Sequence, residues 1–199
     1  MKNKKITEKI TQGMYILTTN GGGCVVDAVS QISFGDNPLI SVAVMKKNNT
    51  NQLLKNNKKF ALSVLNKRAN AEIIKTFGFN STRDINKFEN IDTTEIDGVN
   101  VINDSLGYMI CEIVDSIDND THTLFIGKLV EADMYEDSDA MSYQYYSEHK
   151  EEILKVTTET GRTAWICKIC GYIYYGDNLP NDYKCPVCGV TRELFKRQN

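Results

Sequence analysis

The sequence is poor in several residue types, and it has no long apolar run. Its 199 residues include two histidines, three prolines and one tryptophan. No stretch of about 18 consecutive apolar residues occurs, and the mean hydropathy is −0.36, so we expect no membrane contact. The polar run Thr7-Glu8-Lys9 stands where a signal peptide would need its apolar core, which predicts a cytoplasmic location.

Excess charge and several common catalytic motifs are also missing. The 23 Lys and Arg residues against 26 Asp and Glu residues give a net charge of −3, so no basic field favours nucleic acid. The patterns GxGxxG, GxxxxGK[ST] and HExxH do not occur, which leaves Rossmann, P-loop and zincin sites without their motifs. With His122 and His149 the only histidines, no Ser-His-Asp or Cys-His arrangement is recognisable.

What the chain does contain is a succession of segments with strand character. Residues 39–45 alternate apolar and small side chains, as a half-buried strand does. Strands are predicted at residues 15–19, 25–34, 39–45, 60–65, 99–102, 108–118 and 122–131. Short helices are predicted at 6–13, at 50–56 with Thr50 as N-cap, and at 69–77, and a hairpin loop at Gly21–Gly23. The fold is therefore expected to be mainly β with short helices, a β-barrel rather than a doubly wound sheet.

The last third of the chain changes character, which divides it into parts. We predict a barrel domain at residues 1–149, a linker at 150–163 and a small domain at 164–199. The small domain is too short to be stable through an apolar core alone, so a metal is expected there. It carries a net charge of +2 (five basic, three acidic residues), which leaves −5 for the rest. This difference either helps the two parts dock or is ordinary surface charge.

Four of the six cysteines lie in this small domain. Cys24 and Cys111 stand alone and are interpreted as small buried residues. Cys167, Cys170, Cys185 and Cys188 form two C-x-x-C pairs, each followed by a glycine that permits a positive φ. Two such pairs facing each other make a tetrahedral four-thiolate cage, which suits either zinc or iron.

The sequence around these cysteines resembles a rubredoxin. The resemblance lies in Trp165-x-Cys-x-x-Cys-Gly-Tyr-x-Tyr174, Cys185-Pro-x-Cys-Gly189 and Phe195, with a short gap between the pairs like that of the rubredoxin module of rubrerythrins. It implies one iron held by four cysteines that shuttles a single electron. The alternative is a zinc ribbon that only stabilises the C-terminus. In both cases Trp165, Tyr172, Tyr174 and Phe195 could form a small core.

Residues 8–150 resemble the flavin reductase-like family, which are FMN-binding split barrels similar to flavoredoxin. The resemblance is carried by Tyr15-Ile-Leu-Thr-Thr, Gln31-Ile-Ser33, Lys46-Lys-Asn48-Asn-Thr50, Ser63-Val-Leu65, Arg83-Asp84 with Lys87-Phe88, His122-Thr-Leu-Phe-Ile-Gly127 and the tyrosine-rich Ser142–Tyr146. By this resemblance the flavin-contacting residues are Asp27, Ala28, Val29, Ser30, Gln31 and Ser33, and the phosphate-contacting residues are Lys46, Asn48 and Thr50. A helix N-terminus at Thr50 with lysines before it would favour a phosphate.

Three positions leave alternatives open. Arg83 either reaches the phosphate or pairs with Asp84 or Glu89, and His122 lies either near the flavin ring or on a surface strand. Where relatives with a rubredoxin tail carry Asn-Thr, this chain has Asp27-Ala28. That difference would weaken FMN binding or lower the potential of the flavin.

Together the two resemblances imply an electron-transfer enzyme similar to the high-molecular-weight rubredoxins. Electrons would pass from NAD(P)H through FMN to the iron, and on to a flavodiiron protein or a rubrerythrin-like peroxidase. A homodimer is implied, in which Tyr143, Tyr145 and Tyr146 either cover the neighbour's flavin or pack in a core or interface. Two other hypotheses remain: a flavin reductase that releases reduced FMN and carries a structural zinc, and a non-enzymatic binding module with a zinc ribbon.

Overall fold

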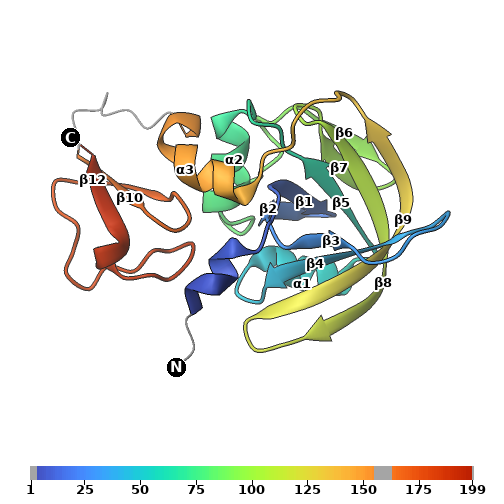
Figure 1. Ribbon diagram of the computed structural model, residues 1–199, viewed down its shortest axis with the longest axis horizontal. Coiled ribbons are helices and arrows are strands. Elements are labelled where there is room, and N and C mark those ends of the chain that lie inside the picture. The colour runs from blue at the N-terminus through green and yellow to red at the C-terminus, as the bar shows by residue number, and fades with distance from the viewer. Residues whose placement is uncertain (1–3, 155–162, 199) are drawn as a thin grey trace.

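A curled seven-stranded antiparallel sheet forms the body of the protein (Figure 1). The computed structural model describes residues 4–154 and 163–198. The strands follow the order β2-β1-β5-β8-β9-β4-β3. They are β1 (Tyr15–Thr19), β2 (Gly22–Val26), β3 (Val29–Gln31), β4 (Leu39–Met45), β5 (Lys59–Val64), β8 (Gly107–Asp118) and β9 (His122–Met134). This mainly β architecture with short helices confirms the predicted fold class.

The hairpin of β8 and β9 is the longest in the sheet and bends it. Its register shifts between Ile110 and Cys111 and again between Ile113 and Asp115. Such irregularities increase the local twist and let a sheet curl. Inside the curl the ring of Phe60 is fully buried, and Gly127 on β9 makes room for it, because a Cβ there would lie 2.7 Å from the ring.

Three α-helices accompany the sheet within the described residues: α1 (Asn49–Asn56), α2 (Ala71–Phe79) and α3 (Tyr143–Ile153). The α1 cap corrects our prediction, because the side chain of Asn48, not of Thr50, accepts the backbone N–H of residue 50. Asn70 and Ser142 cap α2 and α3 in the same way. Within the part of the chain that the structure describes, no helix is long and apolar enough to cross a membrane.

Several local predictions need correction. The single strand expected at residues 25–34 is two strands, β2 and β3, separated by a break at Asp27 and Ala28. The glycines expected in a loop at 21–23 enter β2, where Gly22 and Gly23 pair with Thr19 and Thr18. A side chain at Gly23 would meet the Leu17 carbonyl at 2.5 Å, so close packing rather than loop flexibility explains this glycine. The stub expected at 6–13 is a 3-10 helix, η1 (Lys4–Lys9), and a separate hairpin is formed by β6 (Thr93–Ile96) and β7 (Val99–Ile102).

The C-terminal residues form a separate three-stranded sheet with the order β11-β10-β12. Its strands are β10 (Ala164–Cys167), β11 (Ile173–Tyr175) and β12 (Phe195–Gln198), and the 3-10 helix η2 (Arg192–Leu194) precedes the last one. Cys167, Leu179, Cys185 and Phe195 form its buried centre, with Trp165, Tyr172 and Tyr174 packed around them. The predicted aromatic core is thereby confirmed. We call residues 163–198 the knuckle module.

The segment expected to be a linker at residues 150–163 begins with helix. α3 continues to Ile153, and both Lys150 and Leu154 are buried. Residues 155–162 lie outside the described residues. In Figure 1, α3 (orange) lies between the strands of the knuckle module and the large sheet.

Candidate functional site

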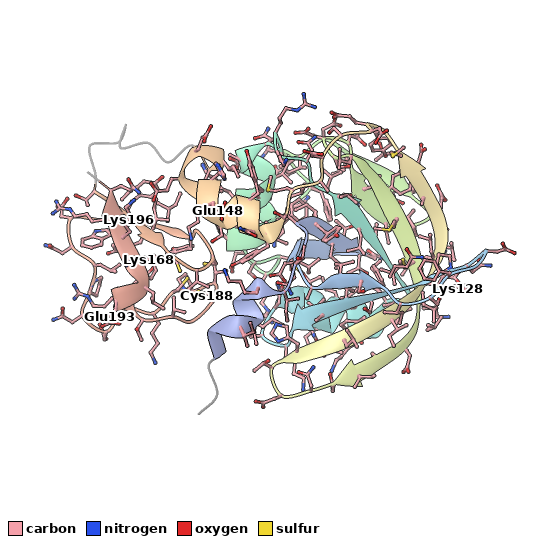
Figure 2. All side chains as sticks on the ribbon, viewed as in Figure 1. Lys128, Glu148, Lys168, Cys188, Glu193 and Lys196 are labelled. Atoms are coloured by element: carbon pink, nitrogen blue, oxygen red, sulfur yellow. The ribbon has the colours of Figure 1, made fainter. Side chains whose placement is uncertain are left out.

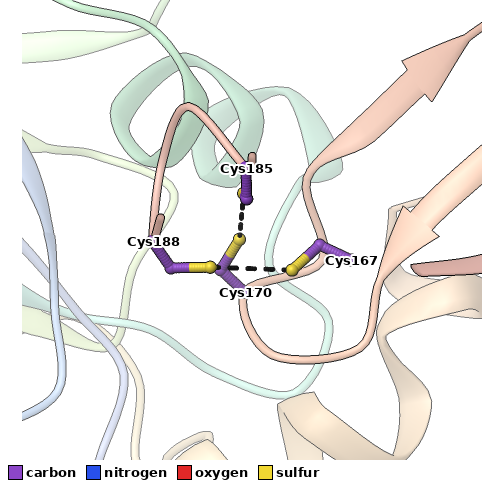
Figure 3. Close-up of side chains that lie close together, drawn as sticks. All are labelled: Cys167, Cys170, Cys185 and Cys188. Atoms are coloured by element: carbon purple, nitrogen blue, oxygen red, sulfur yellow. Dashed lines mark hydrogen bonds between the residues drawn. The ribbon is translucent and has the colours of Figure 1, made fainter. Parts of the chain in front are cut away.

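The four cysteines of the knuckle module meet in one cluster (Figure 3). Their sulfur atoms all lie within 4.8 Å of one another. The Sγ atoms of Cys167 and Cys188 are 3.6 Å apart, and those of Cys170 and Cys185 are 3.5 Å apart. Cys167 and Cys185 are buried, while Cys170 and Cys188 are half-buried. Four thiols at these distances form a compact set of donors of the kind that holds a single metal ion.

The two C-x-x-C turns have nearly the same backbone geometry. Gly171 donates its N–H to the Cys167 carbonyl, and Gly189 donates to the Cys185 carbonyl. Both glycines have a positive φ, +82° and +78°, a conformation that residues with a Cβ rarely adopt. The glycines after each cysteine pair are therefore required by the turn.

Electrostatics within the cluster already favour a thiolate. Hydrogen bonds from the Cys170 and Cys185 thiols, helped by backbone N–H groups, lower the pKa of Cys167 far below its ordinary value. Interactions with the Cys167 and Cys185 thiols, together with burial, raise the pKa of Cys170. Because the thiolate is the form that ligates metals, the cluster is prepared for a cation.

A cavity of about 300 Å³ separates the knuckle module from the large sheet. Its module side is formed by Ile169, Cys170, Val187 and Cys188. Figure 2 shows Cys188 on the side of the module that faces the sheet, and Glu193 farther from it. The opposite wall includes residues of β2, β4, α2 and α3 and the start of β9. Two cysteines of the cluster thus form part of the wall of this cavity.

Three of the predicted cofactor-binding residues line this same cavity: Asp27, Asn48, which was expected at the phosphate, and His122, which was expected either near the flavin ring or on a surface strand. Asp27 lies in the break between β2 and β3, Asn48 caps α1, and His122 opens β9. The Nδ1 atom of His122 lies 2.8 Å from the Thr121 hydroxyl. The cavity therefore carries a carboxylate, an amide and an imidazole on otherwise largely apolar walls.

The other predicted site residues lie around the cavity or away from it. Thr50 is fully buried in α1, and Lys46 is half-buried just before the helix. The Ala28 carbonyl accepts the Ala43 N–H, and Val29 packs on the apolar core of the sheet. Ser30, Gln31 and Ser33 belong to the edge at β3, where the Ser33 hydroxyl accepts the Leu39 N–H.

Arg83 is not part of the cavity beside the cysteines. It lies in a second cavity of about 340 Å³ together with Gly21, Gly22 and Lys87. The structure therefore does not bring Arg83 together with Asp27, Asn48 and His122.

The two isolated cysteines are both buried, as predicted. Cys24 lines the cavity, and Cys111 lies in the sheet core. Burial raises the pKa of Cys24 to about 11, although the polar side chains of Thr50 and Asn48 and the charge of Lys87 oppose the rise. Both thiols stay protonated at neutral pH.

Helix α3 binds the first cysteine turn through its backbone. The Tyr143 hydroxyl donates to the Ile169 carbonyl at 3.1 Å, and the Tyr146 hydroxyl donates to the Cys170 carbonyl at 3.0 Å. The ammonium of Lys150 donates to the Lys168 carbonyl. Three successive carbonyls of one cysteine turn are therefore bound by three side chains of one helix.

Close packing accompanies these hydrogen bonds. A Cβ at Gly171 would lie 2.6 Å from the Tyr146 hydroxyl, so the absence of a side chain there allows the contact. Phe79 of α2 meets the Tyr172 ring edge-on, with 5.9 Å between centroids. Among the residues that the structure describes, a single ion pair crosses the boundary, Lys196 with Glu151 at 3.0 Å.

Burial shifts the pKa of each polar group on this face of α3. It raises the pKa of Tyr143 to about 12, and it raises the pKa of Tyr146 as well. It lowers the pKa of Lys150, while the negative charges of Cys167, Cys170, Glu151 and Cys188 act in the opposite direction. These groups are removed from water and interact with the cluster.

The role of Tyr146 and Lys150 in this contact was not predicted from the sequence. The signal that could have found them is their spacing, because residues 143, 146, 150 and 154 recur at the period of one helix face. Tyr143, Tyr145 and Tyr146 were expected to cover a flavin or to pack in a core or interface. Tyr143 and Tyr146 contact the cysteine turn, whereas Tyr145 stacks on His149 with ring centroids 4.2 Å apart.

Comparison with known sequences identifies both parts of the chain. The flavin reductase like domain matches residues 7–154, and the rubrerythrin, rubredoxin-like domain matches residues 165–196. The high molecular weight rubredoxin of Moorella thermoacetica is 29% identical, with 97% of this chain and 98% of the relative covered. The ferric-chelate reductase (NAD(P)H) of Archaeoglobus fulgidus is 31% identical over 69% of this chain and 85% of the relative.

Solved structures share the fold. A flavin reductase domain protein from Arthrobacter superposes with a TM-score of 0.63 at 17% identity, covering 90% of this chain and 96% of that one. The NADH:FAD oxidoreductase of Streptomyces globisporus superposes with a TM-score of 0.62 at 21% identity, covering 70% and 85%. The chain therefore belongs to the flavin reductase-like family and carries a rubredoxin-like domain at its C-terminus.

Proposed function

We propose that this protein is an oxidoreductase that moves electrons from NAD(P)H through a bound FMN to an iron held by Cys167, Cys170, Cys185 and Cys188. The observation that carries the proposal is the shared cavity. Cys170 and Cys188 form part of the same cavity wall as Asp27, Asn48 and His122. A flavin in that cavity and a metal at the cysteines would be direct neighbours.

The cysteine cluster fits the iron. A tetrahedral site with metal–sulfur bonds of about 2.3 Å has sulfur–sulfur edges of about 3.8 Å. The two measured sulfur–sulfur distances, 3.6 Å and 3.5 Å, are close to that edge. Zinc has the same requirement, so the geometry supports a metal and the resemblance to rubredoxin supports iron.

The cavity fits a flavin. Its volume of about 300 Å³ and its mainly apolar walls with a few polar groups are typical of a cofactor site. The N-terminus of α1, capped by Asn48 and preceded by Lys46 and Lys47, supplies positive potential at the edge of the cavity. One such phosphate site favours FMN over a dinucleotide.

The chemistry belongs to the cofactors, and the chain contributes position and environment. When bound, a flavin accepts a hydride, that is two electrons at once, and a four-thiolate iron passes on one electron at a time. Phe77, Phe79 and Val187 give the cavity apolar walls that exclude water from the space between the two centres. Asp27 places a negative charge beside the flavin, which would lower its potential or its affinity. No protein acid or base is needed, in agreement with the absence of a catalytic triad.

The domain division and the partners are part of the same proposal. Residues 1–149 would act as the flavin unit and 164–199 as the iron unit, with the +2 charge of the latter available to a redox partner such as a flavodiiron protein or a rubrerythrin-like peroxidase. Val114 and Ile117 on β8 are about half-exposed, and Phe34 after β3 is 90% exposed. These exposed apolar side chains support a homodimer.

The test is the visible spectrum of anaerobically purified full-length protein before and after about two equivalents of NADH, because one flavin and one iron together take up three electrons and each NADH supplies two. We expect flavin and ferric–thiolate absorbance at the start, and loss of both after the addition. A Cys170→Ser variant is the matched control, because it removes one ligand and leaves the sheet intact. In that variant only the flavin band should bleach.

Two results would overturn the proposal. If iron is bound but stays ferric while the flavin bleaches, the two centres do not exchange electrons. If the native metal is zinc, the protein is a flavin reductase that releases reduced FMN and carries a structural metal. Metal analysis of protein made at low zinc concentration separates native zinc from zinc taken up during expression.

A further inference from the structure

We propose that Lys150 of α3, aided by the Tyr146 hydroxyl, is a positioning residue that raises the reduction potential of the metal centre from outside the knuckle module. The inference rests on the proposed function in one respect, since it requires a redox-active iron at the four cysteines. It does not depend on the flavin or on the electron donor.

The Lys150 side chain reaches the backbone of the first cysteine turn. The residue is 7% exposed, and its ammonium donates to the carbonyl of Lys168, which lies between Cys167 and Cys170. Its Cδ lies 3.5 Å from the place of a Cβ at Gly171. The stem and the charge of this lysine are therefore packed against the first cysteine turn.

Within the described part of the chain, the Lys150 ammonium is not paired with a carboxylate. The neighbouring Glu151 is engaged with Lys196 at 3.0 Å. The charges that favour the charged form of Lys150 are those of Cys167, Cys170, Glu151 and Cys188, and three of these four belong to the cysteine cluster. A buried cation needs compensating charge, and the thiolate cluster supplies much of it.

An iron centre at the four cysteines would differ in net charge between its two oxidation states. Four thiolates around ferric iron carry one net negative charge, and around ferrous iron they carry two. A nearby buried cation stabilises the doubly charged state more than the singly charged one, because little water screens the interaction. Lys150 therefore favours the reduced centre.

The tyrosine on the same face of α3 acts in the same direction. The Tyr146 hydroxyl points its hydrogen at the Cys170 carbonyl at a distance of 3.0 Å. This donor withdraws electron density from the peptide next to a ligand and adds a positive dipole end near the cluster. Its effect should be smaller than that of the full charge on Lys150.

The experiment measures the midpoint potential of the iron in the full-length protein by optical redox titration of the ferric–thiolate band. Lys150→Gln should lower the equilibrium constant for reduction about tenfold, which corresponds to 59 mV for one electron. Lys150→Arg keeps the charge and should restore the potential. The midpoint potential is measured on the metal centre alone, so the result does not depend on enzyme activity.

Lys47→Gln is the matched control. Lys47 also comes from the large domain, and its ammonium lies 3.7 Å from the place of a Cβ at Gly189 in the second cysteine turn, but its side chain is exposed. Because water screens an exposed charge, this substitution should change the equilibrium constant less than about twofold. Equal shifts for the two glutamine variants would overturn the inference, as would an unchanged potential in Lys150→Gln.

Tyr146→Phe provides a second test that does not depend on the folding of Lys150→Gln. It should shift the potential downward by less than Lys150→Gln does, and no shift would contradict the role of the hydroxyl. A chain that binds no iron at all would overturn the proposed function and this inference together. Normal iron binding with unshifted potentials overturns the inference alone.

Discussion

The large domain and the knuckle module are held together by different means. The large domain buries whole side chains in extensive apolar clusters, among them Phe60, Phe77 and Phe125, each at most 1% exposed. In the knuckle module, two of the four residues at the buried centre are cysteines. The large domain therefore has a core of its own, whereas the core of the module becomes complete when a metal joins its sulfur atoms.

This difference also affects how the two parts meet. Strands of the large sheet bind one another through backbone ladders, but the module is bound by side chains of α3 that reach its backbone. These hydrogen bonds add polar specificity. Ile173 of β11 also packs against an apolar cluster of the large domain, but the buried centre of the module stays a separate cluster. A substitution in one part should accordingly destabilise that part and leave the other folded.

The largest effect is expected from Cys185→Ser. Loss of one ligand should release the metal and unfold the knuckle module, since structural metal binding contributes on the order of 10 kcal/mol in small domains. The seven-stranded sheet should remain folded. Metal analysis combined with amide hydrogen exchange measures both effects. If the amides of β10–β12 stay protected from exchange without metal, the core of the module does not depend on the metal.

The reverse experiment is Phe60→Ala in the large domain. Removal of this fully buried ring should reduce the free energy of unfolding of the large domain by about 3–5 kcal/mol. The ferric–thiolate spectrum of the module should stay unchanged. Phe34→Ala is the matched control, because Phe34 is 90% exposed and its removal should cost less than about 0.5 kcal/mol. Metal loss on Phe60→Ala would mean that the two parts fold as one unit.

The free energy of unfolding of the large domain is expected to depend on pH through Lys87. Its buried ammonium donates to the carbonyls of Gly23 and Phe77, and burial lowers its pKa from 10.5 to about 8. Between these two pH values the unfolded chain holds a proton that the folded chain has released. The stability of the protein should therefore rise relative to Lys87→Met as the pH passes from 8 to 10.5, by about 3 kcal/mol.

Denaturant unfolding of both proteins at several pH values measures this difference. Lys58 is exposed, so Lys58→Met is the control for removing a lysine from the same domain. A stability difference between the natural protein and Lys87→Met that does not change above pH 8 would show that the folded lysine keeps its proton.

The smallest effect is expected from substitution of the two glycines that follow the cysteine pairs, and it should differ between them. Gly171→Ala and Gly189→Ala should each destabilise the module by about 1–2 kcal/mol, because both positions have positive φ. Only at Gly171 does the new Cβ also meet the Tyr146 hydroxyl, at 2.6 Å. Amide exchange in α3 should therefore increase in Gly171→Ala and not in Gly189→Ala. Equal exchange in both variants would mean that α3 does not hold the first turn.

Features encoded by neighbouring residues could be predicted from the sequence. The four-cysteine cluster follows from the C-x-x-C spacing and its glycines, and β4 follows from a strict alternation of side chains. The α1 cap was misplaced because Asn48 and Thr50 are both good N-caps, and only the structure shows which side chain accepts the N–H.

Features that depend on distant segments could not be predicted. Lys150 is a charged residue in a polar stretch, which suggested a linker, and its burial depends on a carbonyl that the cysteine turn presents 18 residues later. The cavity likewise combines side chains from segments far apart in the chain, so no local sequence pattern predicts it. The break at Asp27 and Ala28 arises because the chain passes there from one edge of the curled sheet to the other, from β2 to β3.

The three hydrogen bonds from α3 are accepted by main-chain carbonyls of the first cysteine turn. This bears on whether the knuckle module can be replaced by another four-cysteine module. Carbonyl groups are present whatever side chain a residue carries, so positions such as the exposed Lys168 can change without loss of these hydrogen bonds. Gly171 is the exception, since it must stay without a side chain. A foreign four-cysteine module grafted after α3 should thus dock in the same orientation, provided that a glycine follows its second cysteine.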